Sequence, residues 1–332
     1  MANRQLSEGE AISLIREMLA APSPGLEVGV GDDAAVFNFA TGRVILTVDS
    51  MNEGIHFTFP EYSFADVGWK AMASSVSDVA AMGGQPACAL ISLAFGDPPG
   101  EDDLRALVRG AVEMGDSCNC PIIGGDLCRS TSGLSITVAV AGCQNPAGPV
   151  LRSGAREGDM IGVTGTLGDS AGGLHVLQSH RDDLRLKFAG LVESHLRPRP
   201  QVRAGEALAV TGAAAMEDVS DGLAADLAHI CLESGAGCEV IAADIPLSGE
   251  LRVLAEESCR DPLDWALGGG EDYELIFTGP PGRFDEMVSA LAGVGVQAAN
   301  IGTITLASSG MLMVAGDGAR IDLEGLGYDH FL

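Results

Sequence analysis

Acidic residues in unusual settings are the chemically informative feature of this sequence. They lie beside glycines, small residues or apolar runs rather than in the mixed-charge stretches typical of a solvated surface. The set consists of Asp32, Asp33, Asp49, Asp78, Asp126, Asp218, Asp221, Glu271 and Asp272. Two carboxylates about 4 Å apart repel each other by roughly 4 kcal/mol at an effective dielectric constant near 20. Several of them converging would therefore need positive charge nearby.

Magnesium is the counter-charge that fits this set best. Mg²⁺ takes oxygen ligands, keeps some of its waters and is commonly shared with substrate phosphates. Lysine cannot balance the acids, because Lys70 and Lys187 are the only lysines in the chain. The sequence therefore predicts a carboxylate cluster that holds ATP through bridging metal ions. Arginines in loop-like segments, such as Arg129 and Arg152, would contact the phosphates directly.

Each acidic residue taken alone also has a structural explanation. Asp49 would cap the segment after its strand, Asp78 would be an ordinary acid on a helix face, and Asp126 would close an Asx turn. Asp221 would be the N-cap of a helix that begins at Gly222. The recurrence of the same setting along one chain favours the functional interpretation.

Other common phosphate-binding and metal-binding motifs do not match this sequence. Residues 29–34 imitate the dinucleotide fingerprint G-x-G-x-x-A, but Asp32 and Asp33 would stand where that motif places a pyrophosphate. The following "AVFNF" is typical of a strand rather than a helix, and neither lysine lies in a G-K-[ST] loop. The 8 cysteines form no C-x-x-C pair, which indicates reduced, mostly buried thiols rather than a zinc site.

Composition restricts the possible partners and the compartment. The 332 residues include 46 acidic and 19 basic side chains, for a formal net charge of -27. Such a surface repels nucleic acid and anionic membranes. No apolar run approaches the roughly 18 to 20 residues of a membrane helix, and the N-terminus lacks the apolar region of a signal peptide. We expect a cytoplasmic protein of about two domains.

Alternating helices and strands must position these acids. Periodicity and stop signals predict helices at 7–20, 64–82, 102–117, 166–180, 201–210 and 221–234. Strands are predicted at 43–50, 87–95, 133–142, 160–165, 238–242, 273–278, 299–305 and 311–315. The segment 143–159 is rich in proline, glycine and polar residues, which marks a boundary. We therefore expect two domains, 1–145 and 150–332, of the α/β (α+β) class.

The ordered motifs resemble the thiamine-monophosphate kinases, a family of the aminoimidazole-ribotide-synthetase-like superfamily. The motifs are "VGDDAAV", "TVDSMNEGIHF", "VGWKAMASSVSDVAAMGGQP", "IIGGD", "LRSGAREGD", "VTGTLGDSAGGL", "HLRPRP", "DVSDGLAADLAHI", "GGGEDYEL" and "GYDHF". They run in order through nearly the whole chain, and "GGGEDYEL" with "GYDHF" is highly specific. The resemblance implies transfer of the γ-phosphoryl group of ATP to thiamine monophosphate.

The same resemblance assigns roles to individual residues. Several Mg²⁺ ions would be held by Asp33, Thr47, Val48, Asp49, Asp78, Asp126, Asp218 and Asp221. Val48 has no side-chain oxygen, so it would offer only its carbonyl. ATP would meet Gly125, Asp126, Arg152 and Ser220, and thiamine monophosphate would meet His56 and Glu271. Gly325 stands where the family commonly has an aromatic residue that packs on the substrate rings, so Tyr328 would take that place.

The resemblance also implies the mechanism and the assembly. An anionic oxygen of thiamine monophosphate would attack the γ-phosphorus in line, with no covalent or nucleophilic residue of the protein. Two chains would pair through the sheets of their N-terminal domains, with ATP near that interface. Two alternatives remain open at this point. One is another ATP-dependent member of the superfamily that activates an amide, a carbamoyl group or selenide, and the other is a non-catalytic nucleotide- or metal-binding scaffold.

Overall fold

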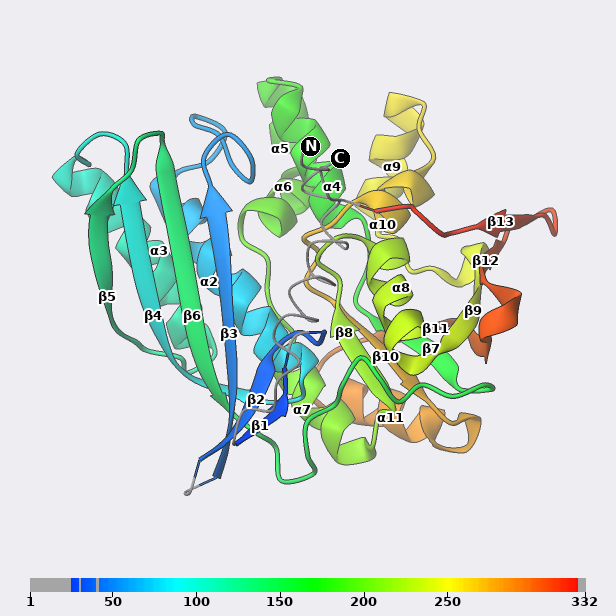
Figure 1. Cartoon of the computed structure of the whole chain (residues 1–332). Coiled ribbons are helices and arrows are strands. Elements are labelled where there is room, and N and C mark those ends of the chain that lie inside the picture. Colours follow the sequence, from blue (N-terminus) through cyan, green and yellow to red (C-terminus); the bar gives the residue numbers. More distant parts are fainter. Residues whose placement is uncertain (1–24, 30, 40–41, 328–332) are drawn as a thin grey trace, which may run out of the picture.

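The computed structural model describes residues 25–29, 31–39 and 42–327. The predicted helix at 7–20 and the predicted stacking residue Tyr328 lie outside this part of the chain. Two sheets, each accompanied by helices, form the described structure (Figure 1). The first sheet draws on residues 26–143 and the second on residues 160–322.

The first sheet has six strands in the order β1-β2-β3-β6-β4-β5. Its strands are β1 (Leu26–Val28), β2 (Ala35–Phe39), β3 (Gly42–Asn52), β4 (Gln85–Phe95), β5 (Ile122–Arg129) and β6 (Leu134–Cys143). Neighbouring strands are antiparallel except β4 and β5, which are parallel. Along β6 the buried residues alternate with half-buried or exposed ones, so one face of the sheet forms the core and the other looks outward.

Helices α2 (Phe64–Ala81) and α3 (Glu101–Ser117) accompany this sheet. A capping box between Ser63 and Asp66 starts α2, and its small and apolar residues are buried on almost every side. The two helices approach closely at Gly68, where an added Cβ would lie 2.0 Å from the carbonyl oxygen of Leu107. A side chain at this position would separate the helices.

The second sheet has seven strands in the order β13-β12-β9-β11-β7-β10-β8. Its strands are β7 (Met160–Thr164), β8 (Ala215–Asp218), β9 (Ala236–Ile241), β10 (Leu275–Gly279), β11 (Ala298–Leu306), β12 (Met311–Val314) and β13 (Arg320–Asp322). Every residue of β8 and β10 is buried. The apolar run of β10 is the pattern expected of a fully buried strand, whereas β8 ends in two acids.

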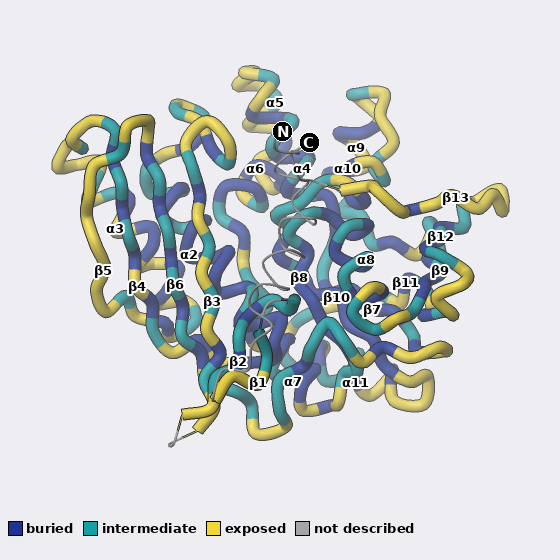
Figure 2. The backbone as a smooth tube through the Cα atoms, viewed as in Figure 1, coloured by how far each residue is buried: buried dark blue, intermediate teal, exposed yellow. Residues whose placement is uncertain are grey.

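Eight α-helices and two short 3₁₀ turns belong to the same half of the described chain. They are α4 (Asp169–Gln178), α5 (Asp182–Lys187), α6 (Ala189–Leu196), α7 (Val202–Thr211), α8 (Leu223–Ser234), α9 (Gly249–Ser258), α10 (Pro262–Gly268), α11 (Pro281–Gly293), η1 (Ala242–Asp244) and η2 (Ala307–Ser309). Helix α2 packs against α6, α7 and β8 as well as against its own sheet. It therefore lies where the two halves meet, and Figure 2 shows it largely in the buried colour.

Most predicted elements are present with shifted ends, and the differences are local. Predicted strand 43–50 is β3, helix 64–82 is α2, and the predicted boundary segment contains no helix or strand between Gln144 and Asp159. The sequence did not predict β5, because two glycines interrupt its apolar run. It also missed β8, whose "AMED" is too short and too acidic to show a strand pattern.

All eight cysteines are free, but only Cys120, Cys231 and Cys238 are buried, so the expectation of mostly buried thiols is wrong. Among the described residues, no helix combines the length and the apolar character needed to span a membrane.

Candidate active site

Four predicted aspartates come together where the two sheets meet. Asp33 precedes β2, Asp49 lies in β3, Asp78 lies in α2 and Asp218 ends β8. One carboxylate oxygen from each of Asp33, Asp78 and Asp218 lies within 4.8 Å of the other two. The carboxyl groups of Asp49 and Asp78 are close enough to interact, and the hydroxyl of Thr47 donates to Asp78 Oδ2. The alternation of β3 places Thr47 and Asp49 on the same inward face.

Burial and mutual repulsion raise the pKa values of Asp49, Asp78 and Asp218. Burial raises the pKa of Asp49, and burial together with Asp49, Asp218 and Asp33 raises the pKa of Asp78 well above its usual range. Burial and the charge of Asp33 raise the pKa of Asp218 to about 8. The cluster is therefore unfavourable with every carboxylate charged and no cation present.

The donor set fits Mg²⁺. It consists of carboxylate oxygens and one threonine hydroxyl, which are ligands that this hard cation prefers. Asp218 Oδ2 is buried and has no hydrogen-bond partner among the described residues, so it offers an oxygen that a cation would satisfy. Val48 lies on the opposite face of β3, with its side chain exposed to solvent. Its side chain points away from the other candidate ligands.

Arg152 is the cation nearest to this cluster in the described structure. Its Nη2 lies 2.9 Å from Asp33 Oδ1 and 3.0 Å from Glu217 Oε1, and its backbone N–H donates to Asp32 Oδ2 at 3.1 Å. Burial lowers the pKa of Arg152, but the ion pairs with Asp33 and Glu217 outweigh burial and raise it. Burial and the charge of Asp33 raise the pKa of Asp32 to about 7.

Asp126 does not join the cluster within one chain. It lies in the edge strand β5 rather than in the glycine-rich turn that the sequence predicted, and it is exposed. Strands β6 and β4 separate β5 from β3, so Asp126 is on the order of 14 Å from Asp49 at the usual spacing of strands. Gly125 and Arg129 lie in the same edge strand, away from the four aspartates.

Ser220 and Asp221 lie in the turn between β8 and α8. Asp226 holds this turn, because its Oδ2 accepts the backbone N–H groups of Ser220, Asp221 and Gly222 at 3.0, 3.1 and 3.1 Å. The N-cap of α8 is Gly222, so the capping role considered for Asp221 is wrong. A Cβ at Gly270 would lie 2.0 Å from Ser220 O, which explains the glycine there.

A cavity of about 610 Å³ opens beside the cluster. Its lining includes Asp49, Asp78, Asp218, Ser220, Asp221, His56 and Glu271. Nδ1 of His56 accepts the backbone N–H of Asn52 at 3.0 Å, so a neutral ring carries its proton on Nε2. Glu271 has φ of 66°, a left-handed conformation that is costly for a residue with a side chain and is concentrated at functional sites.

A buried polar network behind Glu271 was not predicted from the sequence. Lys70 is fully buried, and its Nζ lies 2.6 Å from Glu271 Oε2 and 3.3 Å from the hydroxyl of Tyr62. The Tyr62 hydroxyl also contacts His195 Nε2, and His195 Nδ1 lies 2.9 Å from Ser170 Oγ. The available signal was Lys70 itself, the one basic residue among the small residues of α2.

Asp272 and Gly325 are the two remaining residues that the sequence singled out. Asp272 accepts the backbone N–H groups of Gly168 and Ser170 at 2.6 and 3.0 Å, so it holds the start of α4 rather than joining the aspartates. Burial raises the pKa of Asp272 to about 8. Gly325 is exposed, with φ of 78°, and the aromatic residue proposed as its substitute lies outside the described residues.

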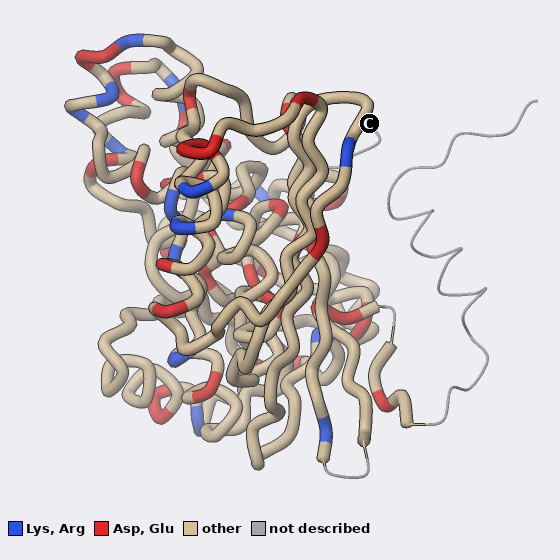
Figure 3. The backbone as a smooth tube through the Cα atoms, turned by 90° about the vertical axis from the view of Figure 1, so that its left-hand side faces the viewer, with Lys and Arg blue, Asp and Glu red and all other residues tan. Residues whose placement is uncertain are grey.

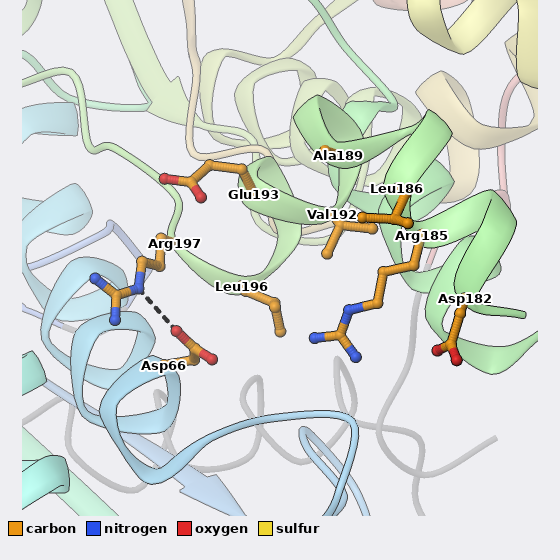
Figure 4. Close-up of a pocket in the computed structure, with 9 residues that line it drawn as sticks. All are labelled: Asp66, Asp182, Arg185, Leu186, Ala189, Val192, Glu193, Leu196 and Arg197. Carbon is orange, nitrogen blue, oxygen red and sulfur yellow. Dashed lines mark hydrogen bonds and ion pairs between the residues drawn. The ribbon is translucent and has the colours of Figure 1, made fainter. Parts of the chain in front are cut away.

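A second hollow, of about 590 Å³, lies among α2, α5 and α6. Figure 4 shows Arg197 directed at Asp66, and their side chains pair at 2.7 Å. The guanidinium of Arg197 also lies over the ring of Trp69, 5.5 Å from its centroid. These contacts join α6 to α2, so we interpret this hollow as part of the junction between the two halves.

Two family profiles match the chain. The AIR synthase related protein N-terminal domain matches residues 31–143, and the corresponding C-terminal domain matches residues 156–315. The thiamine-monophosphate kinase of Escherichia coli O157:H7 is 37% identical over 310 residues, which is 92% of each chain. That of Bacillus subtilis is 33% identical, over 92% of this chain and 94% of the relative.

Solved structures that are similar to this chain indicate the same family. A structure described as AaThiL complexed with AMPPCP and TMP matches with a TM-score of 0.87 at 33% identity, and covers 100% of this chain and 99% of that one. Thiamine-monophosphate kinase from Stenotrophomonas maltophilia K279a matches with a TM-score of 0.77 at 33% identity, over 96% and 100% of the two chains. The hydrogenase maturation protein HypE in complex with ATP matches at 21% identity, a likeness of fold alone.

Proposed function

The chain belongs to the thiamine-monophosphate kinase family of AIR synthase related proteins, and we propose that it transfers the γ-phosphoryl group of ATP to the phosphate of thiamine monophosphate, giving thiamine diphosphate. The observation that carries this proposal is the buried group of Asp33, Asp78 and Asp218 at the edge of a cavity that also contains Glu271 and His56. Such a site can hold phosphates through metal at one end and an organic cation at the other.

The protein's role in the transfer is positioning and charge balance. The attacking phosphate oxygen is already anionic, so no strong general base is required. Asp33, Asp49, Asp78 and Asp218 would hold Mg²⁺ with Thr47. Asp221, which lines the same cavity, would be a further ligand. Mg²⁺ held by these residues would supply positive charge that offsets the negative charge of the phosphates.

Arg152 and Ser220 would contact the nucleotide. The side chain of Arg152 pairs with Asp33 and Glu217. The planar guanidinium of Arg152 is suited to bidentate contact with phosphate, and loosening of its pairing with Asp33 would free it for that contact. The backbone of Ser220 is fixed by Asp226, so its hydroxyl is presented from a rigid turn.

Glu271 and His56 would bind the acceptor. Thiamine carries a positively charged thiazolium ring, and Glu271 is an acid that faces the same cavity as the aspartates. Lys70 contacts one oxygen of Glu271 from the buried side, which fixes the carboxylate and directs its other oxygen. These contacts would direct the substrate phosphate toward the aspartate cluster, in the orientation that in-line attack requires.

A homodimer through the first sheet would complete the enzyme. The outward face of that sheet exposes Leu46, Val48 and Leu90. Figure 3 shows that charged residues are sparse along the strands of this face, and an apolar surface of this kind marks an interaction site. Pairing there would also explain Gly125 and Asp126, because residues of the edge strand would be carried toward the site of the partner subunit.

The two domains would have different roles, and the free cysteines agree with a cytoplasmic location. Residues 1–145 would form the ATP-binding, metal-binding and dimerisation domain, and residues 150–332 would form the second domain, which supplies Asp218, Ser220 and Glu271. The eight free cysteines fit the reducing conditions of the cytoplasm.

A direct assay tests the activity. Purified protein is incubated with ATP, MgCl₂ and thiamine monophosphate, and thiamine diphosphate and ADP are separated and quantified. We expect equimolar products, and no products when Mg²⁺ or thiamine monophosphate is omitted. Tight ATP binding without turnover would favour the scaffold alternative, whereas ATP hydrolysis that an amide, carbamoyl or selenide acceptor stimulates would favour another member of the superfamily.

A further inference from the structure

A second group of metal-ligating side chains lies on the other side of β8 from the aspartate cluster. Glu217 belongs to β8, and Asp226 and His229 lie three residues apart in α8. Successive residues of a strand point to opposite faces, so Glu217 and its neighbour Asp218 are directed to different sides. One potential ligand atom from each of Glu217, Asp226 and His229 lies within 4.8 Å of the other two.

The two acids of this group are buried and incompletely satisfied. Glu217 is 1% exposed and Asp226 is 0% exposed. Glu217 Oε2 and Asp226 Oδ1 have no hydrogen-bond partner among the described residues. A buried carboxylate oxygen without a donor or cation is costly, and the described residues supply neither to these two atoms.

The remaining oxygens are already occupied. Asp226 Oδ2 accepts the three backbone N–H groups of the turn at 220–222. Glu217 Oε1 lies 2.8 Å from His229 Nδ1 and 3.0 Å from Arg152 Nη2. Rotation of either carboxylate would satisfy one oxygen only by leaving the other unpaired, so reorientation of the side chains does not remove the deficit.

Arg152 does not balance the charge of this group. Its guanidinium is shared with Asp33 at 2.9 Å, whereas Glu217 and Asp226 carry two negative charges when ionised. A divalent cation would supply the missing charge and would contact both unsatisfied oxygens. The side chain of His229 is 41% exposed, which gives the group a path to solvent.

We propose that Glu217, Asp226 and His229 form a binding site for a borderline divalent cation such as Zn²⁺, separate from the aspartate cluster. An imidazole nitrogen with two carboxylate oxygens is a typical donor set for Zn²⁺ or Co²⁺, whereas Mg²⁺ takes oxygen ligands. The bound ion would brace Asp226, and through it the turn that presents Ser220 and Asp221. The site itself does not depend on the proposed kinase activity.

Zinc titration in the presence of magnesium tests the proposal. The full-length protein is stripped with a chelator, transferred to buffer with millimolar MgCl₂ to occupy the aspartate cluster, and titrated with ZnCl₂ by calorimetry. We expect one Zn²⁺ per chain and a rise in the thermal midpoint. The variants His229→Asn and Glu217→Gln should lose at least about tenfold in zinc affinity, as is usual for the loss of a group at a metal site.

Two matched variants separate this site from other possibilities. His180→Asn removes an exposed histidine outside the group and should leave zinc binding unchanged. Asp78→Asn alters the aspartate cluster and should also retain the single zinc. No zinc binding by the wild type, or unchanged binding by His229→Asn, would overturn the proposal and leave a proton shared by Glu217 and Asp226 as the explanation. Cobalt substitution supplies a second readout, because a nitrogen ligand from His229 alters the visible spectrum of Co²⁺.

Discussion

Lys70 Nζ lies 2.6 Å from Glu271 Oε2, although the two residues are 201 positions apart in the sequence. The contact joins α2, at the meeting of the two halves, to the segment that carries the proposed thiamine-binding acid. Burial lowers the pKa of Lys70, and Glu271 opposes that shift. Burial and the nearby Lys70 hold the pKa of His195 well below its usual range, so the histidine beside this pair is neutral.

The first prediction concerns this ion pair. Lys70→Met removes the donor that orients Glu271, so the KM for thiamine monophosphate should rise by about tenfold or more, the usual effect of losing a hydrogen bond to a charged group. The KM for ATP should change little, because the change lies at the acceptor end of the cavity. Steady-state kinetics with each substrate varied in turn measure the two constants.

The chain offers a matched control for that variant. Lys187 is the only other lysine, and it is exposed and paired with Glu257. Lys187→Met should keep both constants at the wild-type values, and Lys70→Arg should recover part of the loss. Equal KM values for thiamine monophosphate in Lys70→Met and wild type, with unchanged thermal midpoints, would exclude a positioning role.

The second prediction separates activity from stability in the aspartate cluster. Asp49→Asn should lower kcat by about 100-fold or more, comparable to the loss of one preorganised electrostatic contact in an active site. The same variant should unfold at a higher temperature than wild type in EDTA, because one repelling charge is removed from a buried group. Near wild-type turnover would remove Asp49 from the proposed metal site. Asp183→Asn, at an exposed residue paired with Arg181, is the control.

The third prediction is a pH dependence with a defined sign. The folded-state pKa of Asp218 is raised to about 8, above the value near 3.9 of an unfolded chain. The contribution of this carboxyl to folding is fully present below about pH 4, where both states are protonated, and is lost progressively as the pH rises from there to about 8. Since Mg²⁺ binds the ionised form, the rise in thermal midpoint on adding MgCl₂ should be larger at pH 8.5 than at pH 6. Equal increments at both pH values would contradict the assignment.

The sequence pointed to the four clustered aspartates because an acidic residue is unusual in the local sequence around each of them. An acid in the apolar strand of β3 or among the alanines of α2 needs an explanation that is visible locally. Lys70 is equally anomalous, but its partner lies in a distant segment, and no local pattern connects them. Asp126 shows the opposite problem, because its glycines suggested a turn while pairing with β4 makes the segment a strand.

In the fold too, elements with a strong local pattern were predictable and contacts between distant segments were not. The strand β3 and the helix α2 have strong periodic patterns and were predicted within a few residues. Helices α9, α10 and α11 were missed, although Phe284, Met287 and Leu291 of α11 have helical spacing. Helices α9 and α10 are short, at 10 and 7 residues, and give little periodic signal. The packing of α2 against both halves depends on tertiary contacts that the sequence does not display.

The fourth prediction tests the apolar outward face of the first sheet. Leu90→Glu places a charge among Leu46, Val48 and their neighbours, so it should shift the protein from a dimer to a monomer of 34.0 kDa. Light scattering after size-exclusion chromatography measures the mass. Leu186→Glu, at an exposed leucine in α5, should leave the mass unchanged. A wild-type protein that is monomeric at micromolar concentration would refute the proposed pairing.

The fifth prediction asks which subunit uses Asp126. Asp126→Asn and Asp49→Asn should each lower turnover when present in both chains of a dimer. In a purified heterodimer with one variant in each chain, a site built from Asp49 of one chain and Asp126 of the other is intact once and doubly altered once. Activity should then return to about half of the wild-type value per dimer, since closed two-fold pairing makes the two sites equivalent. If Asp126 instead serves its own chain, both sites carry one substitution and the heterodimer stays as inactive as its parents. Two different affinity tags allow the mixed species to be isolated, and the separation of β5 from β3 within one chain leads us to expect the recovery of activity.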